Sequence, residues 1–113
     1  MRRATPMKLS PELMIGVAAR FKALAEPARL QLLQHLRSGD ASVSELVEET
    51  GLTQANVSKH LQLLLRLGFV TRRKDGLHAY YALADKDTFR LCDLMCGRMQ
   101  RELKKQQRVL ASP

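Results

Sequence analysis

Aromatic residues are scarce in this sequence, and tryptophan is missing: phenylalanine and tyrosine make up 4% of 113 residues. A hydrophobic core must therefore be aliphatic, built mainly from leucine, valine and methionine. So thin a core, in a chain with room for one domain, often depends on a partner subunit. No apolar run is long enough to span a bilayer and no signal-peptide pattern opens the chain, so we expect a cytosolic protein.

Motifs for catalysis are also missing. The sequence has no glycine-rich phosphate loop, paired-carboxylate site or nucleophile elbow. Its two cysteines, Cys92 and Cys96, cannot form a disulfide scaffold, and their spacing is not the C-x-x-C of a redox turn. We predict that the protein is not an enzyme. A small thiol oxidoreductase is the alternative, which a turnover assay with a disulfide substrate would test.

Positive charge, by contrast, is abundant. The 19 basic and 11 acidic residues give a net charge of +8, which favours a polyanionic partner. A basic surface that is merely solvated is the alternative. The distribution favours a nucleic acid, because residues 40–50 are acidic whereas residues 53–81 carry five cations and one acid, Asp75.

The stretch around residues 44–68 predicts a helix-turn-helix. A short helix ends at Gly51, which can adopt a left-handed conformation, and a second helix runs from the N-cap Thr53 to about Leu67. Apolar residues at helical spacing predict its buried side: Val57, Leu61, Leu64 and Leu65. The other side is polar and suits base edges and phosphates in a major groove, with Thr53, Gln54, Asn56, Ser58, Lys59, His60, Gln62 and Arg66 as candidate contacts.

Three further helices are predicted around this motif. Residues 1–9 are predicted to be a flexible tail, and Ser10 then caps a helix that runs to about Ala25. A second helix begins at Glu26–Pro27 and ends at Ser38–Gly39, with Leu30, Leu33 and Leu36 inward. Ser42 caps the short helix, with Glu45 completing a capping box. Asp85 is predicted to cap a final helix to about Leu110.

Between the helix-turn-helix and the final helix, the pattern changes to that of a β-hairpin. Residues 69–74 and 77–83 are predicted strands, joined by a two-residue turn at Asp75–Gly76. This wing carries Arg72, Arg73, Lys74 and His78, which suit the DNA backbone or minor groove. The alternative is a charged strand edge that prevents aggregation.

The predicted fold is mainly α, an α+β winged helix-turn-helix in one domain over residues 10–110. The final helix carries more apolar surface than so small a domain needs, at Phe89, Cys92, Cys96, Met99, Leu103 and Leu110. We therefore expect a homodimer through helices 10–25 and 85–110.

Residues 21–83 resemble the ArsR/SmtB family of bacterial winged-helix repressors. The resemblance lies in LAEPARLQLLQHL, then SVSELVEETGLTQANVSKHLQLLLRLGFV, then RRKDGLHAYYAL. It implies a homodimeric repressor that binds double-stranded DNA at a palindromic operator and leaves it when a signal arrives. Two family metal sites are changed: Ser42 and Ser44 replace a C-x-C pair, and Arg98 and Arg101 replace metal ligands in the last helix.

The cysteines remain as sensing candidates. Cys92 and Cys96 share one face of the last helix, where two protomers could bring four thiols together. They could sense thiol oxidation or reactive sulfur, or bind a thiophilic metal or metalloid ion. Alternatively, both are structural, in a constitutive repressor or an architectural DNA-binding protein that senses nothing. No other cofactor is predicted.

Overall fold

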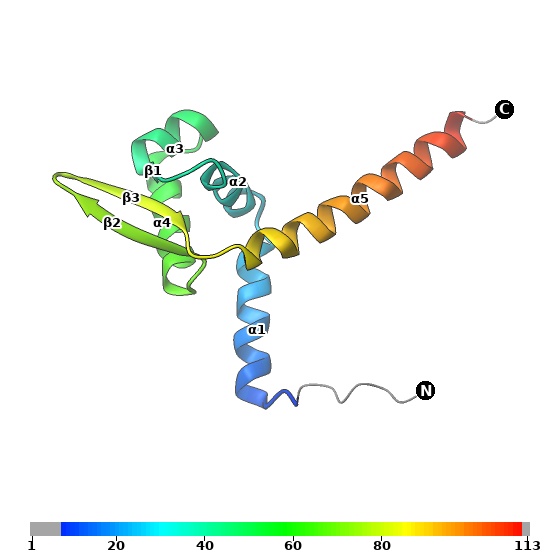
Figure 1. Ribbon diagram of the computed structural model, residues 1–113, viewed down its shortest axis with the longest axis horizontal. Helices are drawn as coiled ribbons and strands as arrows, with labels where there is room; N and C mark the ends of the chain where they lie inside the picture. Colours follow the sequence, from blue (N-terminus) through cyan, green and yellow to red (C-terminus); the bar gives the residue numbers. More distant parts are fainter. Residues whose placement is uncertain (1–7, 112–113) are drawn as a thin grey trace. The chain divides into compact units, whose positions relative to one another are not determined.

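The structure, a computed structural model, describes residues 8–111. It contains two compact units, one ending at Leu83 and the other beginning at Ala84. The predicted winged helix-turn-helix is confirmed, with one additional short strand. The elements, shown in Figure 1, are α1 (Pro11–Leu24), α2 (Pro27–Leu36), β1 (Ala41–Ser42), α3 (Val43–Thr50), α4 (Gln54–Arg66), β2 (Val70–Asp75), β3 (His78–Leu83) and α5 (Asp87–Ala111).

Most of the predicted tail, residues 1–7, lies outside the described residues; Lys8 and Leu9 precede α1 without regular structure. The single domain over residues 10–110 stays a prediction. No helix within residues 8–111 combines the length and the apolar character that crossing a membrane requires.

Three of the helices begin where a hydroxyl side chain can cap them. Ser10 accepts a hydrogen bond from the backbone N–H of Leu13, and Ser42 and Thr53 do the same for the residue three positions on, each at 3.2 Å. These bonds satisfy N–H groups that lack partners within the helix. The predicted starts of α1, α3 and α4 are therefore confirmed.

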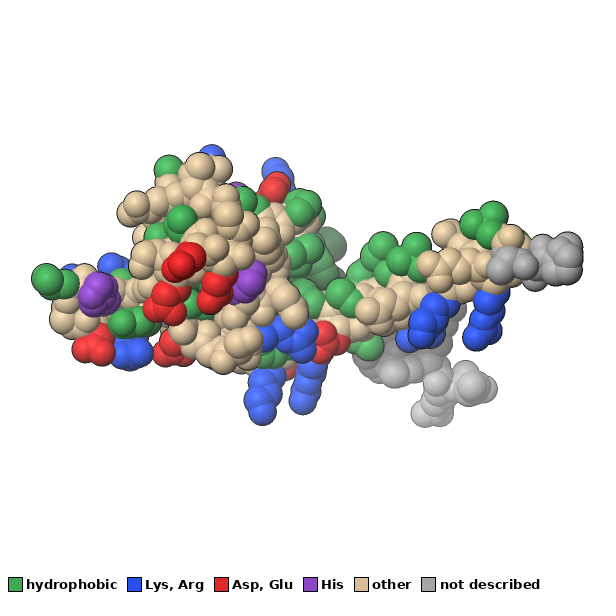
Figure 2. Space-filling view, turned by 90° about the horizontal axis from the view of Figure 1, so that it is seen from above, with side chains coloured by type: hydrophobic (Ala, Val, Ile, Leu, Met, Phe, Trp, Pro, Cys, Tyr) green, Lys and Arg blue, Asp and Glu red, His purple; other side chains and the backbone are tan. Residues whose placement is uncertain are grey.

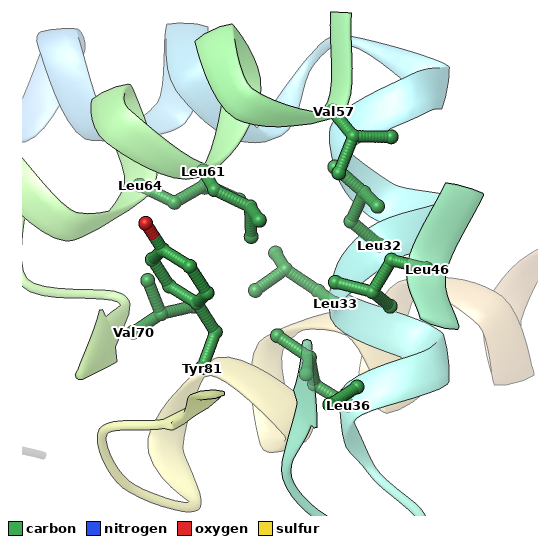
Figure 3. Close-up of a cluster of buried hydrophobic side chains, with 10 residues drawn as sticks. Leu32, Leu33, Leu36, Leu46, Val57, Leu61, Leu64, Val70 and Tyr81 are labelled. Atoms are coloured by element: carbon green, nitrogen blue, oxygen red, sulfur yellow. The ribbon is translucent and has the colours of Figure 1, made fainter. Parts of the chain in front are cut away.

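The core lies between α2, α3, α4 and the base of the wing (Figure 3). The side chains in it come from Leu32, Leu33, Leu36, Ala41, Leu46, Val57, Leu61, Leu64, Val70 and Tyr81. One predicted core residue is wrong, because Leu30 is 40% exposed and Leu32 is buried instead. Each residue of an α-helix is rotated by about 100° from the one before it. The side of α2 that carries Leu32, Leu33 and Leu36 faces the core, and Leu30 lies at the edge of that side. Leu65 of α4 is half-buried.

The sheet has the strand order β1-β3-β2, and all its pairs are antiparallel. The short strand β1 was not predicted, because two residues show no periodicity. The predicted turn is wrong by one residue: Asp75 pairs with His78, and Gly76 and Leu77 form the turn. Gly76 has a φ of 62°, and no described residue other than glycine has a positive φ. This fits a type II′ turn, which has glycine in first place.

The N-cap of helix α5 lies one residue later than predicted. The N–H of Arg90 bonds to the carbonyl of Lys86, which makes Lys86 the N-cap. The carboxylate of Asp85 still accepts a hydrogen bond from the backbone N–H of Asp87 at 3.0 Å. The helix is amphipathic, and Figure 2 shows hydrophobic side chains along one edge and Lys and Arg along the opposite edge. Its large exposed hydrophobics are Leu91, Leu94, Met95, Met99, Leu103, Val109 and Leu110.

Candidate nucleic-acid interface

Helix α4 presents a polar face on the side opposite the core. Val57, Leu61 and Leu64 are fully buried, which fixes the rotation of the helix about its axis. The exposed residues of the predicted contact set on this helix are Thr53, Gln54, Asn56, Lys59, Gln62 and Arg66, while Ser58 is half-buried. The exposed residues at helical spacing along the middle of this face are 55, 59, 62 and 66. Ala55 is thus an additional candidate contact, which its apolar side chain did not indicate. A small side chain there allows close approach to a base edge or a thymine methyl group.

The turn before α4 is held by its own hydrogen bonds. Gly51 has a φ of 75°, in the left-handed region, and its N–H bonds to the carbonyl of Val47. The hydroxyl of Thr50 donates to the Leu46 carbonyl and accepts from the Leu52 N–H. With Leu46 fully buried against the core, α3 and α4 form the predicted helix-turn-helix at a fixed angle.

The wing separates its three cations between two faces. Arg72 pairs with Tyr81 and Lys74 with Ala79, so both lie on the face that carries the buried Val70 and Tyr81. Arg73 lies on the other face opposite Tyr80. Both Arg72 and Lys74 are exposed, and within residues 8–111 neither makes an ion pair.

The charge of Arg73 is already compensated. Its guanidinium lies 3.3 Å from the carboxylate of Asp40 and 3.5 Å from that of Asp75, and its Cζ is 5.0 Å from the centre of the Tyr80 ring. The exposed ring of His78 lies near Tyr80 on the same face, with centroids 6.4 Å apart. Strand alternation thus gives three neighbouring cations two different environments.

His60 is placed differently from the other predicted contacts of α4. It is half-buried, and its Nδ1 lies 3.3 Å from a guanidinium nitrogen of Arg29 on α2. Burial, and next the Arg29 charge, lower the pKa of His60 below its ordinary value of 6.5. His60 is therefore neutral at physiological pH and turned toward α2.

The two cysteines lie on α5, with Cys92 half-buried and Cys96 exposed. Residues 8–111 contain no group of three or more His, Cys, Asp or Glu side chains suited to a metal ion. A tetrahedral thiolate site would need ligands from a second chain in addition to this pair. At the replaced C-x-C positions, the hydroxyls of Ser42 and Ser44 lie 3.2 Å apart, and Ser42 also donates to the Glu45 carboxylate.

Comparison with known proteins agrees with this geometry. Residues 26–72 match the model of the bacterial regulatory protein, arsR family. The chain is 41% identical over 75 residues, which are 66% of this chain and 58% of the other, to a probable mercury resistance operon repressor of Streptomyces lividans. It is 35% identical over 77 residues to the arsenical resistance operon repressor of Bacillus subtilis strain 168, covering 67% of this chain and 73% of that protein.

The fold is similar to that of a solved structure from Mycobacterium bovis. That structure is the homodimeric winged helix-turn-helix DNA-binding domain of a possible ArsR-family transcriptional regulator, with a TM-score of 0.77 and 32% identity. The similarity covers 91% of this chain and 95% of that one. These proteins are DNA-binding transcriptional regulators rather than enzymes. The resemblance seen in the sequence is thereby confirmed, and the chain belongs to the ArsR family of bacterial regulatory proteins.

Proposed function

We propose that the protein is a dimeric, sequence-specific DNA-binding repressor that acts in the cytoplasm. The observation that carries this proposal is the exposed polar face of α4, beside a wing whose Arg72 and Lys74 make no ion pair within residues 8–111. The net charge of +8 and the repressor names of two relatives support it.

On DNA, α4 would enter the major groove. Its amide side chains, Gln54, Asn56 and Gln62, have the donor and acceptor pairs that read adenine and other base edges. Lys59 and Arg66 would bind phosphates, and Thr53 and Ser58 would contact the backbone or a base edge. On the wing, Arg72, Lys74 and His78 are proposed to contact the adjacent backbone or minor groove.

Dimerisation would use the apolar faces of α1 and α5. On α1, Leu13, Met14, Ile15 and Phe21 are between 44% and 71% exposed in the single chain. The large hydrophobics of α5 are also exposed, and rows of exposed apolar side chains of this kind mark interaction surfaces. We call α4 the reading helix. A two-fold dimer would place its two reading helices in half-sites about 34 Å apart, on a palindromic operator.

Selection from a random pool of DNA duplexes would test DNA binding, followed by affinity measurements over a range of salt concentrations. Lys59→Ala should weaken binding to all sequences and lower the slope of log affinity against log salt by about one unit. Lys104→Ala removes the same charge from α5 and serves as the control. Failure to enrich any sequence, with equal affinity for all duplexes, would favour an architectural protein instead.

We further propose that Cys92 and Cys96 release the protein from DNA when they react. The exposed Cys96 would meet an oxidant, reactive sulfur or a thiophilic ion first, and the half-buried Cys92 lies one helical turn away. Mercury and arsenic, which appear in the names of two relatives, are thiophilic.

Binding to the selected duplex should be measured with a thiol oxidant, a polysulfide, and mercury or arsenite, and repeated on Cys92→Ser and Cys96→Ser. Sensing is supported if a reagent releases the wild type from DNA but fails to release Cys92→Ser or Cys96→Ser. The reagent that does so would identify the signal. Unchanged binding with every reagent would make the cysteines structural and the repressor constitutive.

A further inference from the structure

Arg29, the third residue of α2, contacts two other helices at once. Its Nε donates a hydrogen bond to the backbone carbonyl of Ala23 in the last turn of α1, at 2.5 Å. Its Nη1 lies 3.3 Å from Nδ1 of His60 on α4. Both contacts are partly buried, and they join residues 6 and 31 positions away in the sequence. One side chain thus connects the end of α1 with the middle of the reading helix.

The contact with α1 fulfils a need of that helix. Carbonyl groups in the last turn of a helix have no N–H partner within the helix, and Ala23 is buried, with 2% of its surface exposed. A guanidinium near a helix C-terminus also interacts favourably with the helix dipole. Because the guanidinium is planar and carries donors in fixed directions, the bond to Ala23 orients the rest of the group.

The contact with α4 determines the chemical form of His60. A guanidinium can only donate hydrogen bonds, so Nδ1 of His60 must be the acceptor. The imidazole is then neutral, with its proton on Nε2. Burial disfavours protonation most, followed by the charge of Arg29; the charge of Glu26 opposes them, and that of Lys59 adds a smaller effect. A second proton, on Nδ1, would turn this atom into a donor that faces the Nη1 donor of Arg29.

We propose that Arg29 is a positioning residue that fixes α4 to the C-terminal end of α1. This proposal rests on the proposed function, in which α1 lies at the subunit interface and α4 reads the DNA. A shift of α1 at that interface is then passed through the Ala23 carbonyl and Arg29 to His60. The link sets how rigidly the two reading helices of a dimer keep their separation.

The link itself can be tested without DNA by nitrogen NMR of the His60 ring. The wild type should show a single neutral tautomer with the proton on Nε2, and the pKa of His60 should rise in Arg29→Gln. Arg20→Gln is the matched control, because Arg20 is exposed on α1 and, among residues 8–111, donates only to the carbonyl of Gly16 in its own helix. A mixture of tautomers in the wild type, or a ring unaffected by Arg29→Gln, would overturn the proposal.

The consequence for DNA reading is tested on the selected duplex and on the same duplex with one base pair inserted between its half-sites. The wild type should prefer the original spacing, and Arg29→Gln should reduce that preference by about tenfold, within the range of coupling between contacting residues. Arg29→Lys keeps the charge but replaces the planar fork by a single nitrogen on a flexible stem, so it should behave like Arg29→Gln. An unchanged spacing preference in both folded variants would overturn the proposal.

The two readouts separate this proposal from the proposed function. A wild type that selects no duplex refutes the proposed function, whereas the NMR experiment still decides whether Arg29 holds His60. If Arg29→Gln does not fold, the proposal is tested by the spacing preference of Arg29→Lys and by the His60 tautomer of the wild type.

Discussion

Leu103 on α5 offers a direct test of the dimer interface. It lies on the apolar edge of the helix, four residues after Met99, and both side chains are 53% exposed in the single chain. Residues four apart on a helix are neighbours on one face, so a partner subunit that covers one of them covers the other. We expect Leu103→Ala to weaken dimerisation.

The size of the effect follows from the exposed fraction. Complete burial of a leucine side chain contributes about 1.5–3 kcal/mol. About half of the Leu103 surface remains for a partner to cover, so its truncation should cost roughly 0.8–1.5 kcal/mol in each protomer. In a two-fold dimer both protomers carry the substitution, so its cost in free energy of dimerisation counts twice. The dimer dissociation constant should therefore rise roughly 10- to 150-fold, at 1.4 kcal/mol for each factor of ten.

Sedimentation equilibrium of the purified protein measures that constant. Leu77→Ala is the matched control, because Leu77 is completely exposed in the turn of the wing and undergoes the same chemical change. Leu77→Ala should leave the dissociation constant unchanged. Equal constants for the wild type and Leu103→Ala would exclude Leu103 from the interface and refute the assignment of this edge of α5.

Three further outcomes follow from the structure. Arg72→Ala should lower the salt slope of DNA binding by about one unit, whereas Arg73→Ala should hardly change it, because two carboxylates already compensate Arg73; equal changes would place both on phosphates. Above pH 6.5, His60→Gln should have a lower free energy of unfolding than the wild type. This difference should shrink as the pH falls below 6.5. The reason is that, below pH 6.5, the unfolded chain binds a proton at residue 60 that the folded wild type, with its lowered His60 pKa, does not bind. Urea denaturation at several pH values measures the two free energies of unfolding. A difference between them that does not change with pH would contradict the prediction. Leu61→Ala should reduce the free energy of unfolding by about 2–5 kcal/mol, because Leu61 is fully buried; a loss well below this range would mean that the core repacks.

Local features of the fold could be predicted from the sequence because their causes lie within a few residues. The caps at Ser10, Ser42 and Thr53 bond to N–H groups three positions on, and Gly51 supplies the left-handed turn residue from its own backbone. The apolar spacing of α4 likewise fixes its buried and exposed faces, since the helical repeat is a local property. These features were enough to predict the helix-turn-helix and the polar face of its second helix.

The tertiary structure decided what depends on pairing between distant segments. Strand alternation separates Arg73 from Arg72 and Lys74, but only the tertiary structure brings its face beside Asp40, which is 33 residues earlier in the chain. Helix packing turns His60 toward Arg29 and buries Leu32 instead of Leu30. In the sequence, all three wing cations look alike, and His60 looks like one more polar residue of α4. Their environments differ because each environment is built by another element, whose position no local pattern encodes.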